Sequence, residues 1–168
     1  MITPRFKGAH LISDTGELVK RLEMLKSHHV KNGVLTGIGA HPDSKAGATV
    51  AAIAAWNEYG TPRIPSRPFM RNAYGVFKSD VKFIVDAMKA VVFSKDGERL
   101  RKNPNVKAFF DVCGLKIQSL MVAQIDNGQL QRGALSTVLA KEAKGGSDTP
   151  LFDTGILKKS LSFETVKN

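Results

Sequence analysis

Apolar residues recur at helical spacing in four stretches of the chain. Residues 14–29 carry Leu18, Leu22 and Leu25 on one stripe, which predicts a helix that faces the core. Three further stretches, 48–59, 68–92 and 105–126, repeat apolar side chains every three or four residues and predict helices. Gly75 lies inside the third pattern, where it is expected to loosen packing or permit a kink.

Two shorter stretches have the composition of strands. Residues 33–39 are rich in β-branched side chains, and residues 160–166 alternate between two faces, so each predicts a strand. Asp153 or Thr154 is expected to cap a single helical turn before the last strand. These elements predict an α+β fold in which a small antiparallel or mixed β-sheet is packed by several long α-helices. The 168 residues fit one domain, 1–168.

Residues 129–149 interrupt these patterns. They contain few large apolar side chains and include the run KGGSD, which is typical of a flexible surface loop. Their basic residues Arg132, Lys141 and Lys144 are candidates for contacts with a partner that orders this loop during assembly.

The most distinctive segment is residues 53–69, which read IAAWNEYGTPRIPSRPF. Gly60 is expected to end the helix. Pro62, Pro65 and Pro68 fix their own φ angles and favour extended geometry in the residues before them. The residues 60–71, which we term the strap, are therefore predicted to be stiff and outstretched.

The strap and the end of the preceding helix concentrate residue types that anchor protein interfaces. Aromatic residues and arginines are enriched at such sites, and arginine binds carboxylates through two parallel hydrogen bonds. The candidate interface residues are Trp56, Glu58, Tyr59, Arg63, Ile64, Pro65, Arg67, Pro68, Phe69 and Arg71. The alternative is that Trp56 and Phe69 belong to the core and that the arginines are solvated or tie the strap to its own helix.

Charge and chemistry narrow the class of protein. A net charge of +10 favours acidic partners or nucleic acid, although the basic residues are scattered along the chain. Cys113 is the single cysteine, so no internal disulfide and no CxxC metal site can form. His28 and His29 are adjacent, but no HxH or HExxH spacing, nucleophile motif or complete glycine-rich fingerprint is present, so we expect no catalytic residue, no metal and no cofactor. The N-terminal sequence lacks the apolar core of a signal peptide, and no continuous apolar run is long enough to predict a membrane span.

Two motifs resemble those of a known family. The segments WNEYG and IPSRPF, followed near the C-terminus by TPLFDTGILKKSLSF, resemble the signature of tailed-phage tail-completion or neck proteins of the lambda minor tail protein Z type. The resemblance covers roughly residues 15–166 in layout and is strong in these two stretches. It implies a structural virion protein without enzymatic activity, assembled in the host cytoplasm and located at the neck or tail.

The resemblance also implies partners. Proteins of this type are expected to act as rings or ring-associated copies that join the tail to the DNA-filled head. The partners would be other copies of the chain and neighbouring proteins such as the connector, the tail terminator or the tail tube, with no membrane, while contact with DNA stays open. Two alternatives remain: a tail terminator that caps the tail tube, and a small basic DNA-binding protein.

Overall fold

The computed structural model describes residues 15–35, 47–93, 105–127, 130, 143 and 155–168. In chain order the elements are α2 (Thr15–Lys26), β1 (His28–Val34), α3 (Val50–Tyr59), α4 (Phe69–Ser79), α5 (Val81–Val92), α6 (Val106–Asp126), α8 (Ile156–Ser160) and β2 (Leu161–Lys167). Helices and one antiparallel pair of strands make a small α+β fold, which confirms the predicted class.

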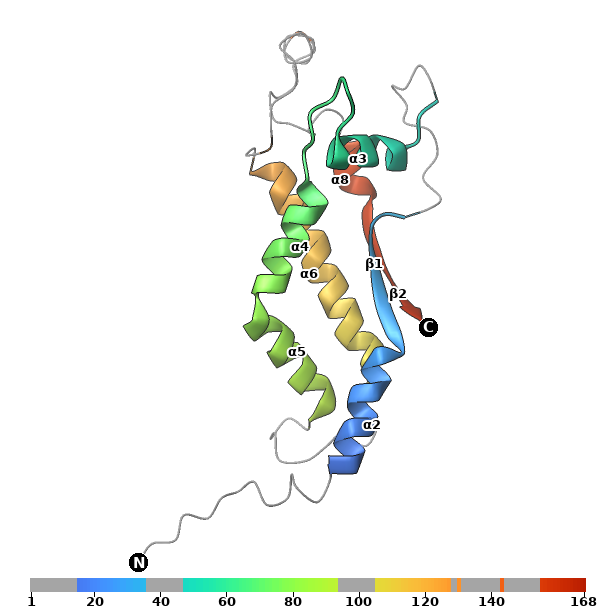
Figure 1. Ribbon diagram of the computed structural model, residues 1–168, viewed down its shortest axis with the longest axis vertical. Coiled ribbons are helices and arrows are strands. Elements are labelled where there is room, and N and C mark those ends of the chain that lie inside the picture. The colour runs from blue at the N-terminus through green and yellow to red at the C-terminus, as the bar shows by residue number, and fades with distance from the viewer. Residues whose placement is uncertain (1–14, 36–46, 94–104, 128–129, 131–142, 144–154) are drawn as a thin grey trace, which may run out of the picture.

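Helix α6 is the centre of the fold. It packs against α4 and α5 on one side and against both strands on the other (Figure 1). Asn105 caps its start, since Asn105 Oδ1 accepts a hydrogen bond from Ala108 N at 3.1 Å. Gly114 allows the sheet to approach closely, because a Cβ there would lie 2.3 Å from Cδ2 of Phe163. The helix predicted at 105–126 is confirmed.

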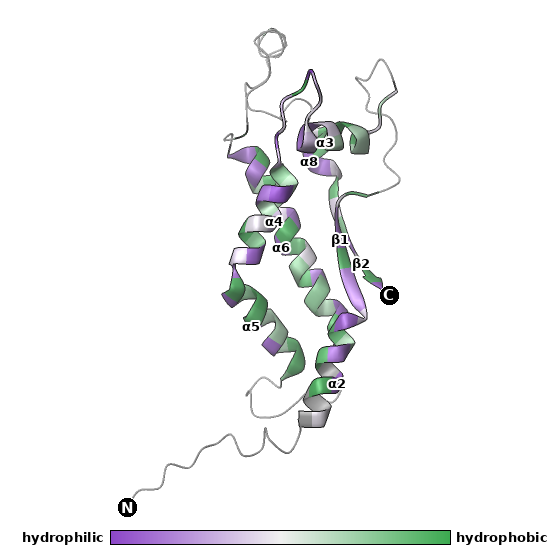
Figure 2. Ribbon diagram, in the orientation of Figure 1, coloured by the Kyte–Doolittle hydropathy of each residue, from purple (hydrophilic) through white to green (hydrophobic). Residues whose placement is uncertain are grey.

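By length and composition, α6 could also cross a membrane, and it is the one helix in the described residues that passes this test. A core helix passes the same test. The sheet makes polar contacts with α6: Asn32 Nδ2 donates to Gly114 O at 3.0 Å, and Gln118 Nε2 donates to Leu161 O at 2.7 Å. Figure 2 shows apolar residues along α6 where α4, α5 and the strands surround it. Packing within this fold accounts for part of its apolar composition, whereas Val112 and Leu115 remain exposed.

The two strands pair from His28 with Lys167 to Val34 with Leu161. The last strand lies where the sequence predicts it. The first strand begins at His28 rather than at residue 33, and the helix before it ends at Lys26 rather than at residue 29. The start of β1 is polar, so the sequence shows no alternation of apolar and polar residues there. Polar residues are tolerated because the inward-facing positions are only half-buried against α6. The predicted strand residues 36–39 lie outside the described residues.

Helix α2 is not the core-facing helix that its leucine stripe predicts. Val19, Leu22 and Met24 are exposed, and Leu25 is half-buried. Figure 1 shows α2 extending beyond the end of the sheet and of α6, away from the core.

The helix predicted at 68–92 is two helices, α4 and α5, which meet at Asp80. Asp80 leaves helical geometry at φ −83° and ψ 61°, and its Oδ1 accepts a hydrogen bond from Phe83 N at 3.2 Å. Gly75, where a kink was expected, lies inside an unbroken α4. A capping aspartate therefore sets the break.

The core lies where α3, α8 and the start of α4 meet the second half of α6. Its largest fully buried side chains are Phe69, Ile125 and Val50. Helix α8 begins after Gly155, which has φ 70°, and the predicted caps Asp153 and Thr154 lie outside the described residues. The C-terminal helical turn is confirmed.

Candidate interface site

The strap begins with a tight reversal rather than an outstretched chain. Thr61 N donates to Ile64 O at 2.8 Å, and Ile64 N donates back to Thr61 O at 3.2 Å. Pro62 occupies the second position of this turn, where its fixed φ is favoured. The prediction of an extended strap is therefore wrong for residues 61–64. Arg63 lies exposed at the turn, which forms part of the loop projecting past α3 in Figure 1.

Gly60 is required where the turn begins. Its φ of 80° and ψ of 170° lie in a region that is essentially restricted to glycine. Its N–H donates to Trp56 O at 2.9 Å and closes α3, as predicted. A Cβ at this position would lie 3.0 Å from Ser66 N, so the chain returns close against the end of the helix.

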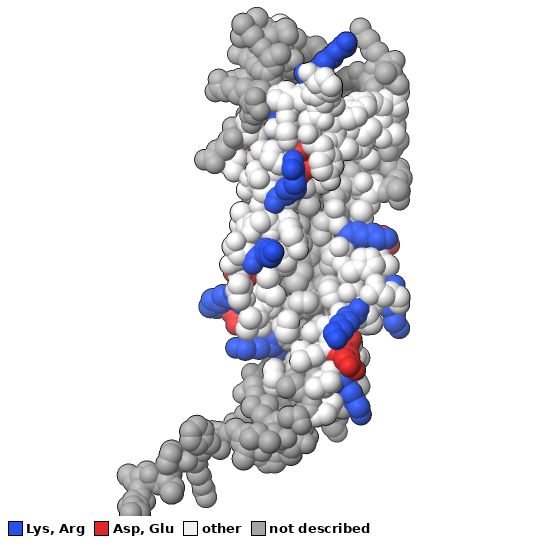
Figure 3. Space-filling view, viewed as in Figure 1, with Lys and Arg blue, Asp and Glu red and all other residues white. Residues whose placement is uncertain are grey.

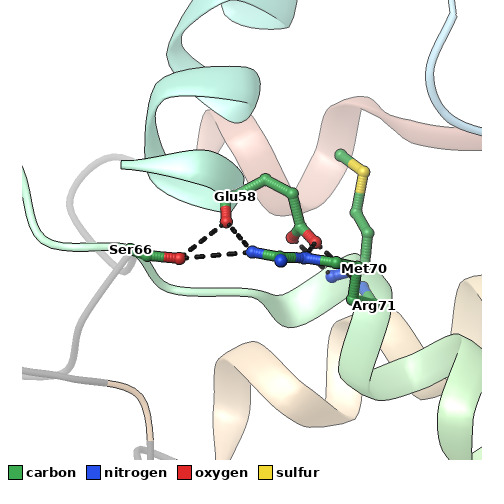
Figure 4. A network of polar contacts seen from close by, with 4 residues as sticks. All are labelled: Glu58, Ser66, Met70 and Arg71. Carbon is green, nitrogen blue, oxygen red and sulfur yellow. Dashed lines mark hydrogen bonds and ion pairs between the residues drawn. The ribbon is translucent and has the colours of Figure 1, made fainter. Parts of the chain in front are cut away.

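Glu58 is the centre of a polar network that binds the strap to α3 (Figure 4). Its side chain is 3% exposed, and its carboxylate accepts hydrogen bonds from Met70 N at 2.9 Å, Arg71 N at 3.0 Å and Arg71 Nε at 2.9 Å. Its backbone carbonyl accepts from Ser66 Oγ at 2.9 Å and from Arg71 Nη2 at 2.7 Å. The Glu58 carboxylate thus caps the start of α4, because it accepts hydrogen bonds from two N–H groups that have no partner within the helix. Pro68, at the N-cap position, makes no side-chain hydrogen bond.

Arg67 makes a second buried attachment. Its Nη1 donates to Asn57 Oδ1 at 2.7 Å, and its backbone N donates to Asn57 O at 2.6 Å. Asn57 in turn donates through Nδ2 to Ile53 O at 2.8 Å, one helical turn earlier. Burial lowers the pKa of the Arg67 guanidinium from its ordinary value. These contacts hold the strap against its own helix.

The structure thus divides the predicted interface residues. Glu58, Arg67 and Phe69 are buried within the chain, so they cannot contact a partner directly as predicted. Ile64, Pro65 and Pro68 are half-buried. Four predicted residues remain on the surface: Trp56, Tyr59, Arg63 and Arg71.

Two of the surface residues come together. The Arg71 guanidinium lies 5.4 Å from the centroid of the Tyr59 ring, a cation–π contact at the end of α3. Tyr59 is 73% exposed and Trp56 is 43% exposed, one turn apart on the same helix. The surface end of α3 therefore presents two aromatics and a cation on a rigid support.

A groove that the sequence does not reveal lies next to this surface. It has a volume of about 480 Å³ and runs between β1, α3 and α4, with Ile117 and Met121 of α6 at its floor. Met70 and Tyr74 line it from α4. Tyr74 follows Arg71 by three residues, so the sequence indicates that both lie on the same face of α4. Nothing in the sequence indicates that β1 lies opposite that face.

A second hollow is basic. It has a volume of about 620 Å³ and is lined by Lys20, Lys107 and Lys167, with Glu23 as its acidic residue. The predicted loop residues Arg132, Lys141 and Lys144 lie outside the described residues. Figure 3 shows Lys and Arg spread over one face of the molecule rather than gathered in one block.

Other candidates have structural roles. Cys113 is buried on α6, and this burial raises the pKa of its thiol. Within the described part of the chain, no group of three or more His, Cys, Asp or Glu side chains is placed to hold a metal ion. No protein-family model matches the chain, and no curated protein or solved structure is significantly similar to it. The family resemblance rests on the two motifs.

Proposed function

We propose that this chain is a structural virion protein of a tailed phage, without enzymatic activity, that works at the head–tail junction. It completes the neck or tail as a ring or as a ring-associated subunit, so that the tail joins the filled head. Its partners are other copies of itself and neighbouring connector, tail-terminator or tail-tube proteins.

The observation that carries this proposal is that the two family-like motifs share one end of the fold. Helix α3 holds the WNEY part of the first motif, and α8 holds the ILKKS part of the second motif, nearly a hundred residues later in the chain. The two helices pack against each other (Figure 1). Motifs that form one packed unit support a shared architecture better than two separate matches would.

The strap supplies the docking surface in this proposal. Trp56, Tyr59, Arg63 and Arg71 project from a support that Glu58 and Arg67 fix internally. A ring needs two different patches on each copy, because each patch binds the other patch on the next copy. The strap is one patch, and the loop 129–149, with Arg132, Lys141 and Lys144, is the second, which orders during assembly.

The test is a cryo-electron-microscopy map of the complete virion. Ring density for this chain at the neck, with residues 60–71 against a neighbouring subunit, is the expected result. Density that caps the tail tube without contacting the head connector would instead assign the chain as a tail terminator. Absence of the chain from particles would refute the structural proposal.

DNA binding is the second candidate function, because the basic hollow brings together Lys20, Lys107 and Lys167. A DNA-binding protein would bind duplex DNA with an affinity that falls steeply with salt, since each phosphate contact releases counterions. Fluorescence anisotropy over a salt series measures that slope. Changing Lys20 and Lys167 together to Ala should reduce the slope by about two if the hollow is the site.

A further inference from the structure

The outer edge of β1 carries backbone groups that no other described strand pairs. Asn168 N donates to Ser27 O at 2.7 Å, one step beyond the pairing of His28 with Lys167. Hydrogen-bonded pairs alternate along an antiparallel ladder. His29, Lys31 and Gly33 therefore bond to β2, and the residues between them direct their N–H and C=O groups away from it.

These outward groups belong to His28, Val30, Asn32 and Val34. Within the described residues, no backbone hydrogen bond outside the regular elements involves the N–H or C=O groups of these four residues. Val30, Asn32 and Val34 also line the groove of about 480 Å³, whereas no residue of β2 does. The unpaired edge therefore forms one wall of the groove.

The groove has the parts that an extended peptide requires. A strand edge offers backbone donors and acceptors, and pockets beside it take alternate side chains of the added segment. Ile117 and Met121 form an apolar floor, and Met70 provides an adaptable thioether wall. Its volume lies within the range of small ligand sites and suits a few residues of extended chain.

The charge at the rim selects an acidic segment. Glu58 lines the groove, but its carboxylate is buried and occupied by three donors. The Arg71 side chain is 57% exposed, and its Nη1 has no partner within the described part of the chain. The whole chain carries a net charge of +10, which favours an acidic partner. Figure 3 shows an uncharged surface between α4 and β1 with cations on either side.

We propose that this groove binds an extended segment of another protein, apolar at alternate positions and acidic at its ends, as a third strand on β1. The segment pairs with the outward groups of Val30, Asn32 and Val34. An apolar side chain enters the groove above Ile117 and Met121, and a carboxylate meets Arg71. The proposal concerns the chemistry of a partner and holds whether or not the protein lies at the neck.

Nuclear magnetic resonance with isotope-labelled full-length protein tests this inference. The probe is an acetylated and amidated Glu-Val-Leu-Val-Glu peptide, titrated to about 5 mM because short peptides bind weakly. Saturating shifts at the amides of residues 28, 30, 32 and 34 are expected. The same peptide with Lys in place of Glu should bind about fivefold more weakly, which is the effect of one exposed ion pair.

Two controls separate strand addition from general stickiness. A peptide N-methylated at every residue has no free N–H on either edge, so it cannot pair with β1 and should not bind. Val30→Pro removes one outward N–H without breaking the β1–β2 ladder and should weaken binding at least about fivefold. His29→Ala, on the open face of the same strand, should bind as the unmodified protein does. Thermal unfolding of each variant verifies its fold, and the N-methylated peptide keeps the test decisive if Val30→Pro does not fold.

Three results would overturn the proposal. One is the absence of saturating shifts at these amides. Another is equal binding by the N-methylated peptide. The third is self-association, seen by sedimentation velocity, that protects the same amides in the free protein, because the occupant would then be a second copy of this chain.

Discussion

Glu58 stabilises the fold chiefly as the cap of α4, and its removal is therefore expected to be costly. In Glu58→Ala, Met70 N and Arg71 N lose their acceptor, at about 1 kcal/mol each for a lost helix cap. The ion pair with Arg71 adds at most about 1 kcal/mol, because the arginine is more than half exposed. The expected loss is about 3 kcal/mol of unfolding free energy, or about 6–12 °C in Tm for a chain of this size.

The assay is chemical denaturation followed by tryptophan fluorescence, since Trp56 lies two residues before Glu58 on α3. Glu58→Gln keeps the shape and one good acceptor, so it should cost about half as much as Glu58→Ala. Glu164→Gln, at an exposed position on β2, is the matched control and should lie within about 0.5 kcal/mol of the unmodified protein.

A double-mutant cycle with Arg71→Ala tests the reasoning itself. If the backbone cap dominates, Arg71→Ala alone should cost clearly less than Glu58→Ala, and the coupling should stay near or below about 1 kcal/mol. The assignment is refuted if Glu58→Ala is as stable as the control. It is also refuted if the coupling accounts for most of the loss, because the ion pair would then carry the stability.

Three further substitutions test separate parts of the fold by chemical denaturation. Gly60→Ala should cost about 1–3 kcal/mol, because its φ of 80° and ψ of 170° suit only glycine. Gly114→Ala should cost about 1–3 kcal/mol, because its Cβ would lie 2.3 Å from a phenylalanine ring, whereas Gly75→Ala, with open space around it, should gain about 0.5–1 kcal/mol. The hydrogen bond from Lys107 lowers the pKa of the Asp111 carboxyl below its ordinary value of 3.8. The ionised carboxylate therefore stabilises the fold above pH 3.8, and this stabilisation is lost as the pH falls through the lowered pKa. Asp111→Asn should remove this part of the acid destabilisation when the free energy of unfolding is measured from about pH 2 to pH 5.

The sequence predicts the central helices well because their signal is local. The apolar repeat of α6 extends over six turns, and Asn105 and Asn127 lie at its two ends. The break at Asp80 was missed because the apolar stripe continues from α4 into α5, although Ser79 and Asp80 are the residue types that begin helices. The continuous apolar pattern led to a prediction of one helix, whereas in the structure the capping residue Asp80 divides it into two.

The candidate site could be located from the sequence but not divided into inner and outer residues. The motif concentrates aromatics and arginines at the end of α3, and four of them are exposed there. Nothing local shows that Glu58 caps a helix that begins eleven residues later, because that contact exists only after the turn at Thr61–Ile64 reverses the chain. The groove was missed for the same reason: β1 and α4 are distant in sequence and come together only in the folded chain, where Met70 lies next to Gly33.

The internal network has a consequence for assembly. Binding costs free energy when loops and side chains must be ordered at the interface. The strap is already fixed, since Glu58 and Arg67 connect it to α3 through buried hydrogen bonds before any partner arrives. A neighbour that docks on Tyr59 and Arg63 would therefore spend little free energy on ordering this patch. Substitutions at Glu58 should weaken docking only as far as they loosen the strap. Substitutions at exposed Tyr59 should weaken docking and cost at most about 1 kcal/mol of stability, the value of its exposed cation–π contact with Arg71.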